Sequence, residues 1–335
     1  MNAVGKGTTT FAIAVGARGP LPAYRPDTRL SCAAAGRYHL PRLFTSHPAF
    51  SQTMPPVINA PSNLDADVVL GFGDEWSRFD QSALTAAEHK QLWDNYFSIF
   101  PWHLLPADAK GVDIGCGSGR WAQLVAPRVG ALTCVDASPQ ALDVARRNLA
   151  SHPNVSFTLA SVDAMPFPPA HFDFGYSLGV LHHIPDTQAG LQAATATLRP
   201  GAPFLLYLYY AFDNRPAWFR RLWRVSETLR YAISRSPFPL RFVLTQLCAA
   251  LIYWPLARGA RLIERMGGRV DSLPLSTYLN LSFYTMRTDA LDRFGTRLEK
   301  RYTRAEIEAM MHNASLGDVT FANGPYFWIA LGYKR

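Results

Sequence analysis

The stretch VDIGCGSGR at residues 112–120 places a short apolar segment directly before a turn that holds three glycines. Other apolar segments of strand length follow it, and helical patterns separate them. The predicted strands are 110–114, 131–135, 155–159, 172–177 and 203–209, and the predicted helices between them are 121–125, 138–150 and 187–198. Strands that alternate with helices in this way favour an α/β fold with a doubly wound parallel sheet.

The glycine turn has the spacing GxGxG, which differs from the GxGxxG of dinucleotide-binding folds. In those folds the third glycine lets the helix pack closely on the strand, and here Arg120 holds that position. The turn also follows Asp113, and a carboxylate is an unfavourable neighbour for a pyrophosphate. An acid beside a glycine turn suits a ligand that carries an ammonium group.

Three acids follow three successive predicted strands: Asp113, Asp136 and Asp163. The carboxyl ends of parallel strands meet at one edge of the sheet, so these side chains are expected along one elongated ligand. Asp136 suits the two hydroxyls of a ribose, and Asp163 suits an exocyclic amine of adenine. The alternative for each acid alone is a helix cap or a turn aspartate. All three in order, together with the glycine turn, favour an adenosine-containing ligand with a cationic tail.

These segments resemble the class I S-adenosylmethionine-dependent methyltransferases, above all the ubiquinone/menaquinone-type small-molecule enzymes. The resemblance lies in VDIGCGSGR (112–120), CVDASPQALDVARRN (134–148) and SVDAMPFPPAHFDFGYSLGVLHHI (161–184), and it covers about residues 70–212 and 301–335. It implies a mostly parallel seven-stranded sheet and S-adenosylmethionine as the cofactor. A helix at 303–314 and two closing strands, at 317–323 and 326–334, are expected to complete the sheet.

The resemblance also implies which residues hold the cofactor. Gly115, Gly117 and Gly119 would shape the turn around its methionine part, which Asp113 would anchor. Asp136 would hold the ribose, Asp163 and the Ala164 backbone the adenine, and Ser177 and Leu178 would lie under the methionine moiety.

Candidate acceptor-site residues follow the fourth and fifth strands. His182 and His183 stand where the methyl group should emerge, and a histidine near neutrality can act as a general base. The alternative is that the two histidines only cap the strand. The substrate candidates are Tyr209, Tyr210, Arg220, Arg221 and Arg224, the arginines because a guanidinium binds phosphate or carboxylate oxygens. The cysteines and histidines show no metal-ligand spacing, and no metal is expected.

The charge is concentrated in two segments of the 335-residue chain, which carries 33 Lys+Arg against 25 Asp+Glu. The first basic segment is residues 1–60, which are expected to form an extension: a disordered tail, a transit-like peptide, or residues before a start at Met54. The expected order is then a helical lid (61–108), the cofactor-binding core (109–212), an arginine-rich helical cap for the substrate (213–300) and the closing helix and hairpin (301–335).

The second basic segment is residues 213–270, which contain eleven arginines and three acids. An apolar arc of helical spacing runs from Trp218 to Ile233, and Pro237 and Pro239 break that helix. The uncharged run 242–257 is too short for a membrane span. It predicts a buried cap helix or, alternatively, a helix that lies on an anionic membrane surface.

The sequence therefore predicts methyl transfer from S-adenosylmethionine to oxygen, nitrogen or carbon of a small metabolite that is anionic or carrier-linked. An RNA methyltransferase is one alternative, since the basic insert could follow a phosphate backbone. A non-catalytic interaction protein with this fold is another. Four scattered cysteines favour a reducing compartment, so the expected location is the cytoplasm, in solution or at a membrane surface.

Overall fold

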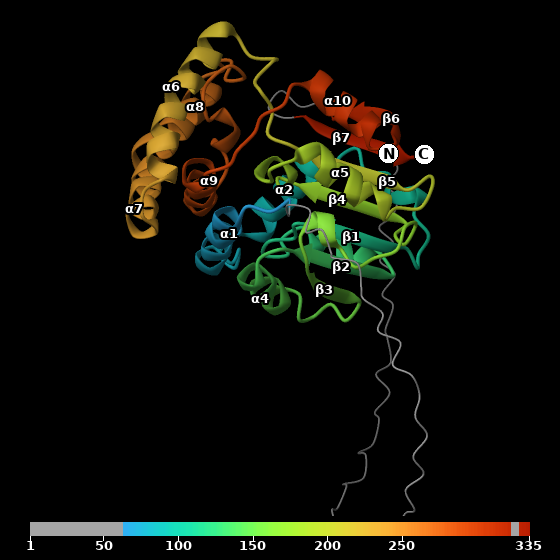
Figure 1. Cartoon of the computed structure of the whole chain (residues 1–335). Coiled ribbons are helices and arrows are strands. Elements are labelled where there is room, and N and C mark those ends of the chain that lie inside the picture. Colours follow the sequence, from blue (N-terminus) through green and yellow to red (C-terminus); the bar gives the residue numbers. More distant parts are fainter. Residues whose placement is uncertain (1–62, 323–327) are drawn as a thin grey trace, which may run out of the picture. The chain divides into compact units, whose positions relative to one another are not determined.

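A seven-stranded sheet forms the core of the computed structural model, which describes residues 63–322 and 328–335 (Figure 1). The strands are β1 (Lys110–Ile114), β2 (Ala131–Asp136), β3 (Val155–Leu159), β4 (Phe174–Leu178), β5 (Pro203–Tyr207), β6 (Leu316–Phe321) and β7 (Ile329–Lys334). Their order is β3-β2-β1-β4-β5-β7-β6, and β7 is antiparallel to both of its neighbours. The predicted doubly wound, mostly parallel sheet of seven strands is confirmed. The basic extension expected at 1–60 lies outside the described residues.

The chain builds this sheet outward from β1, first through β2 to β3 and then through β4 to β5. The order therefore reverses between β1 and β4, which pair in parallel with Asp113 opposite Tyr176. In open α/β sheets, ligands bind outside the carboxyl ends of the strands at such a reversal.

Helices α3 (Ala122–Val125), α4 (Pro139–Asn148), α5 (Thr187–Ala196) and α10 (Arg304–Asn313) connect or follow these strands. Their starts are set by local chemistry. The Ser138 hydroxyl caps α4 by accepting from the Ala141 N–H, and Pro lies in its first turn. Thr303 and Glu306 form the capping box that their spacing predicts.

Period-two alternation along the strands divides the core into two layers. Phe204 and Leu206 of β5 face the layer that contains α5 and α10. Leu205, between them, faces the opposite layer with Phe174 and Tyr176. That layer is filled by aromatic side chains from the segment before β1.

The segment before β1 forms α1 (Ala66–Arg78) and α2 (Ala86–Phe97) and a 3₁₀ turn at Trp102–Leu104. Trp93 and Phe97 of α2 stack with ring centroids 4.0 Å apart and are buried in the core. Phe79 is also buried, against Phe242 and Tyr284 of the later insert. Phe79 is therefore a packing residue, whereas Trp76 of the same segment lines a cleft.

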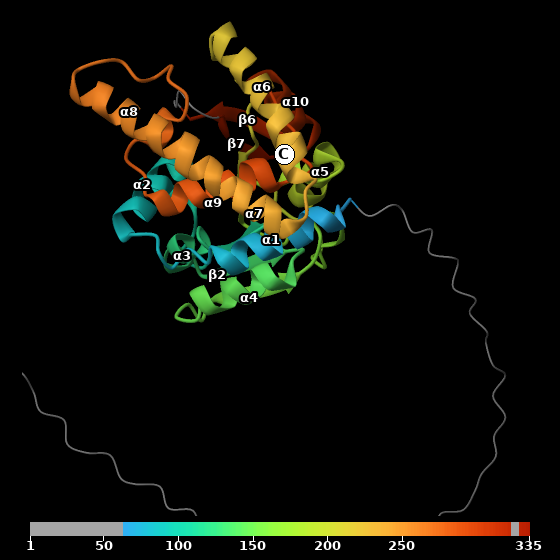
Figure 2. The same cartoon turned by 90° about the vertical axis from the view of Figure 1, so that its left-hand side faces the viewer.

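The insert after β5 is helical, as the sequence predicts. It contains α6 (Ala217–Ser234), α7 (Phe238–Cys248), the π-helical η5 (Ala249–Tyr253), α8 (Trp254–Arg265), a 3₁₀ turn at Ser276–Tyr278 and α9 (Phe283–Gly295). Pro237 separates α6 from α7 and occupies the N-cap of α7. α9 packs against α6, α7 and η5, around a small core that includes Met286, Ala290 and Phe294 (Figure 2).

The continuous helical run Phe238–Arg265 is long and apolar enough to cross a membrane by those two criteria. This run extends beyond the uncharged stretch 242–257, because Arg241 and Arg258 continue the helix on either side. Its most apolar window is 28% buried, a low value for the core helix of a soluble domain.

Candidate cofactor and acceptor site

A cleft opens outside the carboxyl ends of β1, β2 and β4, at the reversal of strand order. Its lining is formed by strand ends and turns (Ile114, Gly115, Val135–Ser138, Ala160–Val162, Leu178–Leu181, His183, Ile184) and by residues on or just before α1 (Asn63–Asp65, Val68, Val69, Phe72, Trp76). Most of these groups are apolar, and the polar ones include Asp136 and His183. The shape and lining are typical of a site for a small cofactor.

The glycine turn borders the cleft through Gly115, and its backbone conformation favours glycine. Gly115, Gly117 and Gly119 have φ of 75°, 54° and 76°. A Cβ at Gly115 would lie 2.4 Å from Val180, and one at Gly117 would lie 2.8 Å from the indole of Trp76. These positions therefore have no room for side chains. Gly117 and Gly119, predicted to contact the cofactor, are buried and do not line the cleft.

Asp136 reaches the cleft from the end of β2, as predicted. One carboxylate oxygen accepts from the Gly117 N–H at 2.9 Å, and the other accepts from the Ser138 N–H at 2.8 Å. These bonds couple the glycine turn to the start of α4. Burial raises the pKa of Asp136. A carboxylate has about four acceptor positions, so Asp136 retains capacity for two hydroxyl donors.

Asp113 does not reach the cleft. Alternation along β1 directs its side chain to the opposite layer, where it is 1% exposed and accepts from the Tyr176 hydroxyl at 3.0 Å. Burial raises the pKa of Asp113 to about 8, so its carboxyl is protonated at neutral pH. The structure therefore contradicts direct anchoring of an ammonium group by Asp113.

Asp163 and Ala164 are exposed and lie just beyond Val162, which does line the cleft. Asp163 accepts a hydrogen bond from the Asn63 N–H at 2.9 Å and so holds the chain that enters α1. Ser177 is buried, and its hydroxyl donates to the Ile114 carbonyl. Of these predicted contacts, only Leu178 is among the lining residues described above.

The two histidines differ. His183 lines the cleft, and its Nδ1 lies 2.7 Å from the Leu298 carbonyl. A carbonyl only accepts, so Nδ1 carries the proton and Nε2 is left as an acceptor. Nε2 is buried without a hydrogen-bond partner, 3.7 Å from a carboxylate oxygen of Asp292 that also lacks one. Burial lowers the pKa of His183 to about 4, so the ring is neutral at physiological pH.

His182 is fully buried behind His183 and does not line the cleft. Its ring lies 4.0 Å from that of His183 and 3.9 Å from that of Tyr209, centroid to centroid. Burial lowers the pKa of His182 well below its usual value. We therefore assign it a packing position, which the sequence could not distinguish from the neighbouring one.

Asp292 of α9 is the site residue that the sequence did not reveal. Its second carboxylate oxygen accepts a hydrogen bond from the Tyr209 hydroxyl, and burial raises the pKa of Asp292. Asp292 comes from the insert, far along the chain from His183 and Tyr209. No local pattern in RTDALDRF (287–294) marks it.

The predicted substrate residues are only partly brought together. Tyr209 packs beside the histidines, whereas Tyr210 is buried against Phe212 and Arg215. The side chains of Arg220, Arg221 and Arg224 are exposed on α6 and line none of the described cavities. The expected arginine contacts to the substrate are therefore absent from the cleft.

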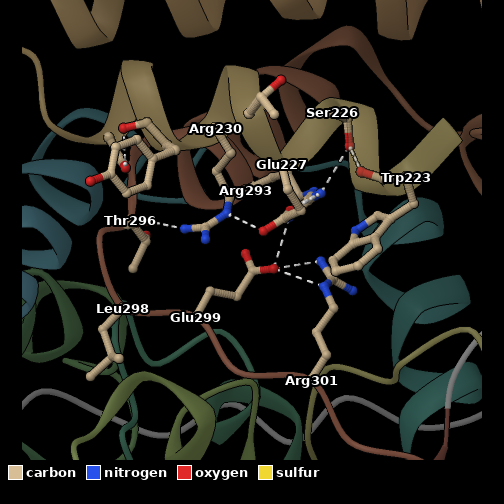
Figure 3. A network of polar contacts seen from close by, with 12 residues as sticks. Trp223, Ser226, Glu227, Arg230, Arg293, Thr296, Leu298, Glu299 and Arg301 are labelled. Atoms are coloured by element: carbon tan, nitrogen blue, oxygen red, sulfur yellow. Dashed lines mark hydrogen bonds and ion pairs between the residues drawn. The ribbon is translucent and has the colours of Figure 1, made fainter. Parts of the chain in front are cut away.

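Other arginines of the insert point inward and form a buried network (Figure 3). Glu227 of α6 binds Arg230 at 2.9 Å and Arg293 at 2.6 Å, and Glu299 binds Arg293 at 2.8 Å and Arg301 at 2.7 Å. The network joins α6 and α9 to the segment that returns to the core. That segment also carries the Leu298 carbonyl, so the network holds it against His183.

The cleft, the glycine turn and the strand order define a class of protein, and comparison with known families agrees. Residues 112–201 match the family described as a methyltransferase domain. Residues 112–201 therefore belong to a methyltransferase domain of the class I type, for which S-adenosylmethionine is the cofactor. Within residues 63–322 and 328–335, no group of three or more His, Cys, Asp or Glu is placed to hold a metal.

Among curated relatives, a ubiquinone biosynthesis O-methyltransferase of Xanthomonas axonopodis pv. citri is 32% identical over 148 residues, which are 39% of this chain and 62% of that protein. The enzyme of the same name from Idiomarina loihiensis is 34% identical over 94 residues, 28% of this chain and 39% of that protein. The chain thus spans less than two thirds of these relatives. A solved S-adenosylmethionine-dependent methyltransferase of Thermotoga maritima, described as a possible histamine N-methyltransferase, is 13% identical with a TM-score of 0.45, over 79% of this chain and all of that one.

Proposed function

We propose that this protein transfers the methyl group of S-adenosylmethionine to a small-molecule acceptor. The observation that carries the proposal is a cleft at the strand reversal that is lined by Asp136 and by His183, whose buried Nε2 has no hydrogen-bond partner. The bound cofactor supplies a methyl group already activated on a sulfonium. The chain then has to orient the acceptor and exclude water, which together can account for up to ~7–11 kcal/mol of the barrier.

His183 is suited to activate the acceptor. Its Nε2 is neutral, buried and free to accept a hydrogen bond from a hydroxyl or amine, and the Leu298 carbonyl fixes the tautomer. Asp292, beside it, would stabilise the imidazolium that forms when the proton is taken. This arrangement favours an oxygen or nitrogen acceptor over carbon, and the names of the relatives favour oxygen.

We further infer that the acceptor is linked to a lipid or another carrier and that the reaction takes place in the cytoplasm at a membrane surface. The apolar lining of the cleft and the exposed apolar residues of the insert support this. The hypothesis that the acceptor is anionic is supported by Arg220, Arg221 and Arg224 alone. Since these side chains line no described cavity, they would contact the carrier or its surroundings rather than the reacting group.

Calorimetric titration with S-adenosylmethionine tests the proposal. We expect micromolar binding by the wild type and a loss of about tenfold or more in Asp136→Asn, because an amide presents one acceptor fewer to the ribose and to the turn. Asp143→Asn is the matched control, since Asp143 is exposed on α4 and pairs only with Arg146 among the described contacts. A folded wild type that does not bind, or equal affinity in the two variants, would contradict the assigned site.

A further inference from the structure

The exposed apolar side chains of this protein are concentrated in one part of the fold. Among the described residues, eighteen large hydrophobic side chains are exposed, and all but Leu70, Leu104 and Leu159 lie between Trp218 and Met266. Soluble proteins rarely leave a large contiguous apolar patch uncovered, and such patches mark interaction surfaces.

These side chains recur at helical spacing on the outer helices of the insert. Leu222, Val225 and Leu229 follow one another on α6, and Leu247, Leu251 and Trp254 follow one another on α7, η5 and α8. We call these six residues and their exposed neighbours the apolar surface of α6–α8. In Figure 1 these helices lie on the side of the insert away from the sheet, and Figure 2 looks onto that side.

The inner faces of η5 and α8, and the C-terminal end of α6, are covered by the protein. Ile233, Ala249, Tyr253 and Ala257 pack against α9 in the small core of the insert. The apolar surface of α6–α8 is therefore not a misplaced core, because a separate set of residues already fills that position.

The charge around this surface is basic. Residues 213–270 contain eleven arginines, of which Arg220, Arg221, Arg224, Arg235, Arg265 and Arg269 are exposed. Arg258, whose guanidinium also donates to the Leu279 and Leu281 carbonyls, lies over the ring of the exposed Trp254 at 4.2 Å from its centroid. Apolar stripes bordered by arginine and tryptophan are typical of helices that lie in the headgroup region of an anionic bilayer.

We propose that the apolar surface of α6–α8 docks this protein onto an anionic lipid bilayer, with the helices lying in the plane of the membrane. The helices do not cross the bilayer, because their inner faces hold polar contacts such as Arg287 Nε to Gln246 Oε1 at 2.6 Å. Charge argues against a second copy as the occupant, since two such surfaces would bring their arginines together. The docking itself does not depend on the proposed function. One consequence does rest on it: docking would give the enzyme access to acceptors that reside in the membrane.

Sedimentation with vesicles tests the docking. We expect the wild type to bind vesicles of phosphatidylcholine mixed with phosphatidylglycerol, and to bind phosphatidylcholine alone more weakly. Leu247→Ser with Leu251→Ser should lower the affinity for the mixed vesicles about tenfold or more, because two leucines no longer enter the bilayer. The matched control is Leu104→Ser with Leu159→Ser, which removes two leucines of similar exposure outside the surface and should leave binding unchanged.

A second variant separates the electrostatic part. Arg261 and Arg265 follow the exposed Trp254 at helical spacing on α8 and share its face. Replacing both by Gln should weaken binding to the mixed vesicles about tenfold or more, since each basic residue near an anionic surface contributes about 1 kcal/mol. The same variant should bind phosphatidylcholine as the wild type does. Binding that is absent from the wild type, or equal in the two leucine pairs, overturns the proposal. So does a dimer in light scattering that Leu247→Ser with Leu251→Ser dissociates.

Calorimetry with S-adenosylmethionine on the same samples separates this inference from the proposed function. Vesicle binding without cofactor binding would support the docking and contradict the proposed enzymatic function. Cofactor binding without vesicle binding would do the reverse.

Discussion

At the scale of single residues, strand alternation decides which acids at the carboxyl ends of the strands can serve the cofactor. Asp136 ends β2 and faces the cleft, whereas Asp113 faces the buried layer beside Tyr176. Asp113 is the last but one residue of β1 and Asp136 the last residue of β2, so a position near the end of a strand does not by itself predict access to the ligand. The direction in which the side chain leaves the strand determines that access.

Asp113→Asn is expected to stabilise the protein at neutral and higher pH. The pKa of Asp113 is about 8 in the folded protein, above that of an unfolded aspartate. Between these two values the folded state holds a proton that the unfolded state has lost, so stability falls as the pH rises towards 8. Asn keeps an acceptor for the Tyr176 hydroxyl and needs no proton.

Thermal unfolding at pH 5 and pH 8 measures this effect. The gain in the free energy of unfolding should be about 2 kcal/mol or more at pH 8, and clearly smaller at pH 5. A gain that does not change with pH would show that Asp113 is ionised in the folded state.

His183→Gln is expected to lower methyl transfer by about 10²–10⁴-fold, the usual contribution of a general base. Cofactor binding measured by calorimetry should remain, because the variant keeps the size of a polar side chain. The assay follows labelled methyl from S-adenosylmethionine into membrane extracts. His103→Gln, an exposed position on the 3₁₀ turn, serves as the control. Since the pKa of His183 is about 4, wild-type activity should not depend on this group above pH 6.

At the scale of elements, the buried network determines how the insert meets the core. Glu299 is 1% exposed in its side chain and accepts from both Arg293 and Arg301 (Figure 3). Removal of one partner from a buried ion pair leaves the others uncompensated, which costs about 3–5 kcal/mol. The contribution of these arginines to stability therefore depends on where they lie and not on how many they are.

Glu299→Gln should therefore lower the free energy of unfolding by about 3–5 kcal/mol in urea titration. The exposed pair of Arg146 with Asp143 provides the comparison, and Asp143→Asn should cost less than about 1 kcal/mol. Similar losses in the two variants would mean that the network is hydrated in solution.

The sheet and the glycine turn could be predicted because their signals are local: strand, turn and helix follow one another within a short stretch of sequence. The acceptor side could not, because Asp292 meets His183 through an insert whose docking depends on tertiary contacts. Periodicity also gave the apolar arc of α6 without its direction. Leu222 and Leu229 turned out to be exposed, and Ile233 buried. Helical spacing identifies an apolar face, but it does not tell whether protein or lipid covers that face.

At the scale of the molecule, the network and the cleft should make the insert and the sheet unfold together. A ligand present at a hundredfold excess over its dissociation constant stabilises the folded state by about 2.7 kcal/mol. For a domain of this size that corresponds to roughly 5–10 °C in Tm, at about 2–4 °C per kcal/mol.

Scanning calorimetry should therefore show one transition for residues of both parts, and S-adenosylmethionine should move the whole of it upward. The physical reason is that Glu299 and Arg293 link the helices of the insert to the segment beside His183, so the insert cannot open without disturbing the cofactor cleft. In Glu299→Gln this link is weakened, and a second transition that does not respond to the cofactor should separate from the first. Two transitions in the wild type, with only one responsive to the cofactor, would show that the insert folds independently and that the network does not couple it to the site.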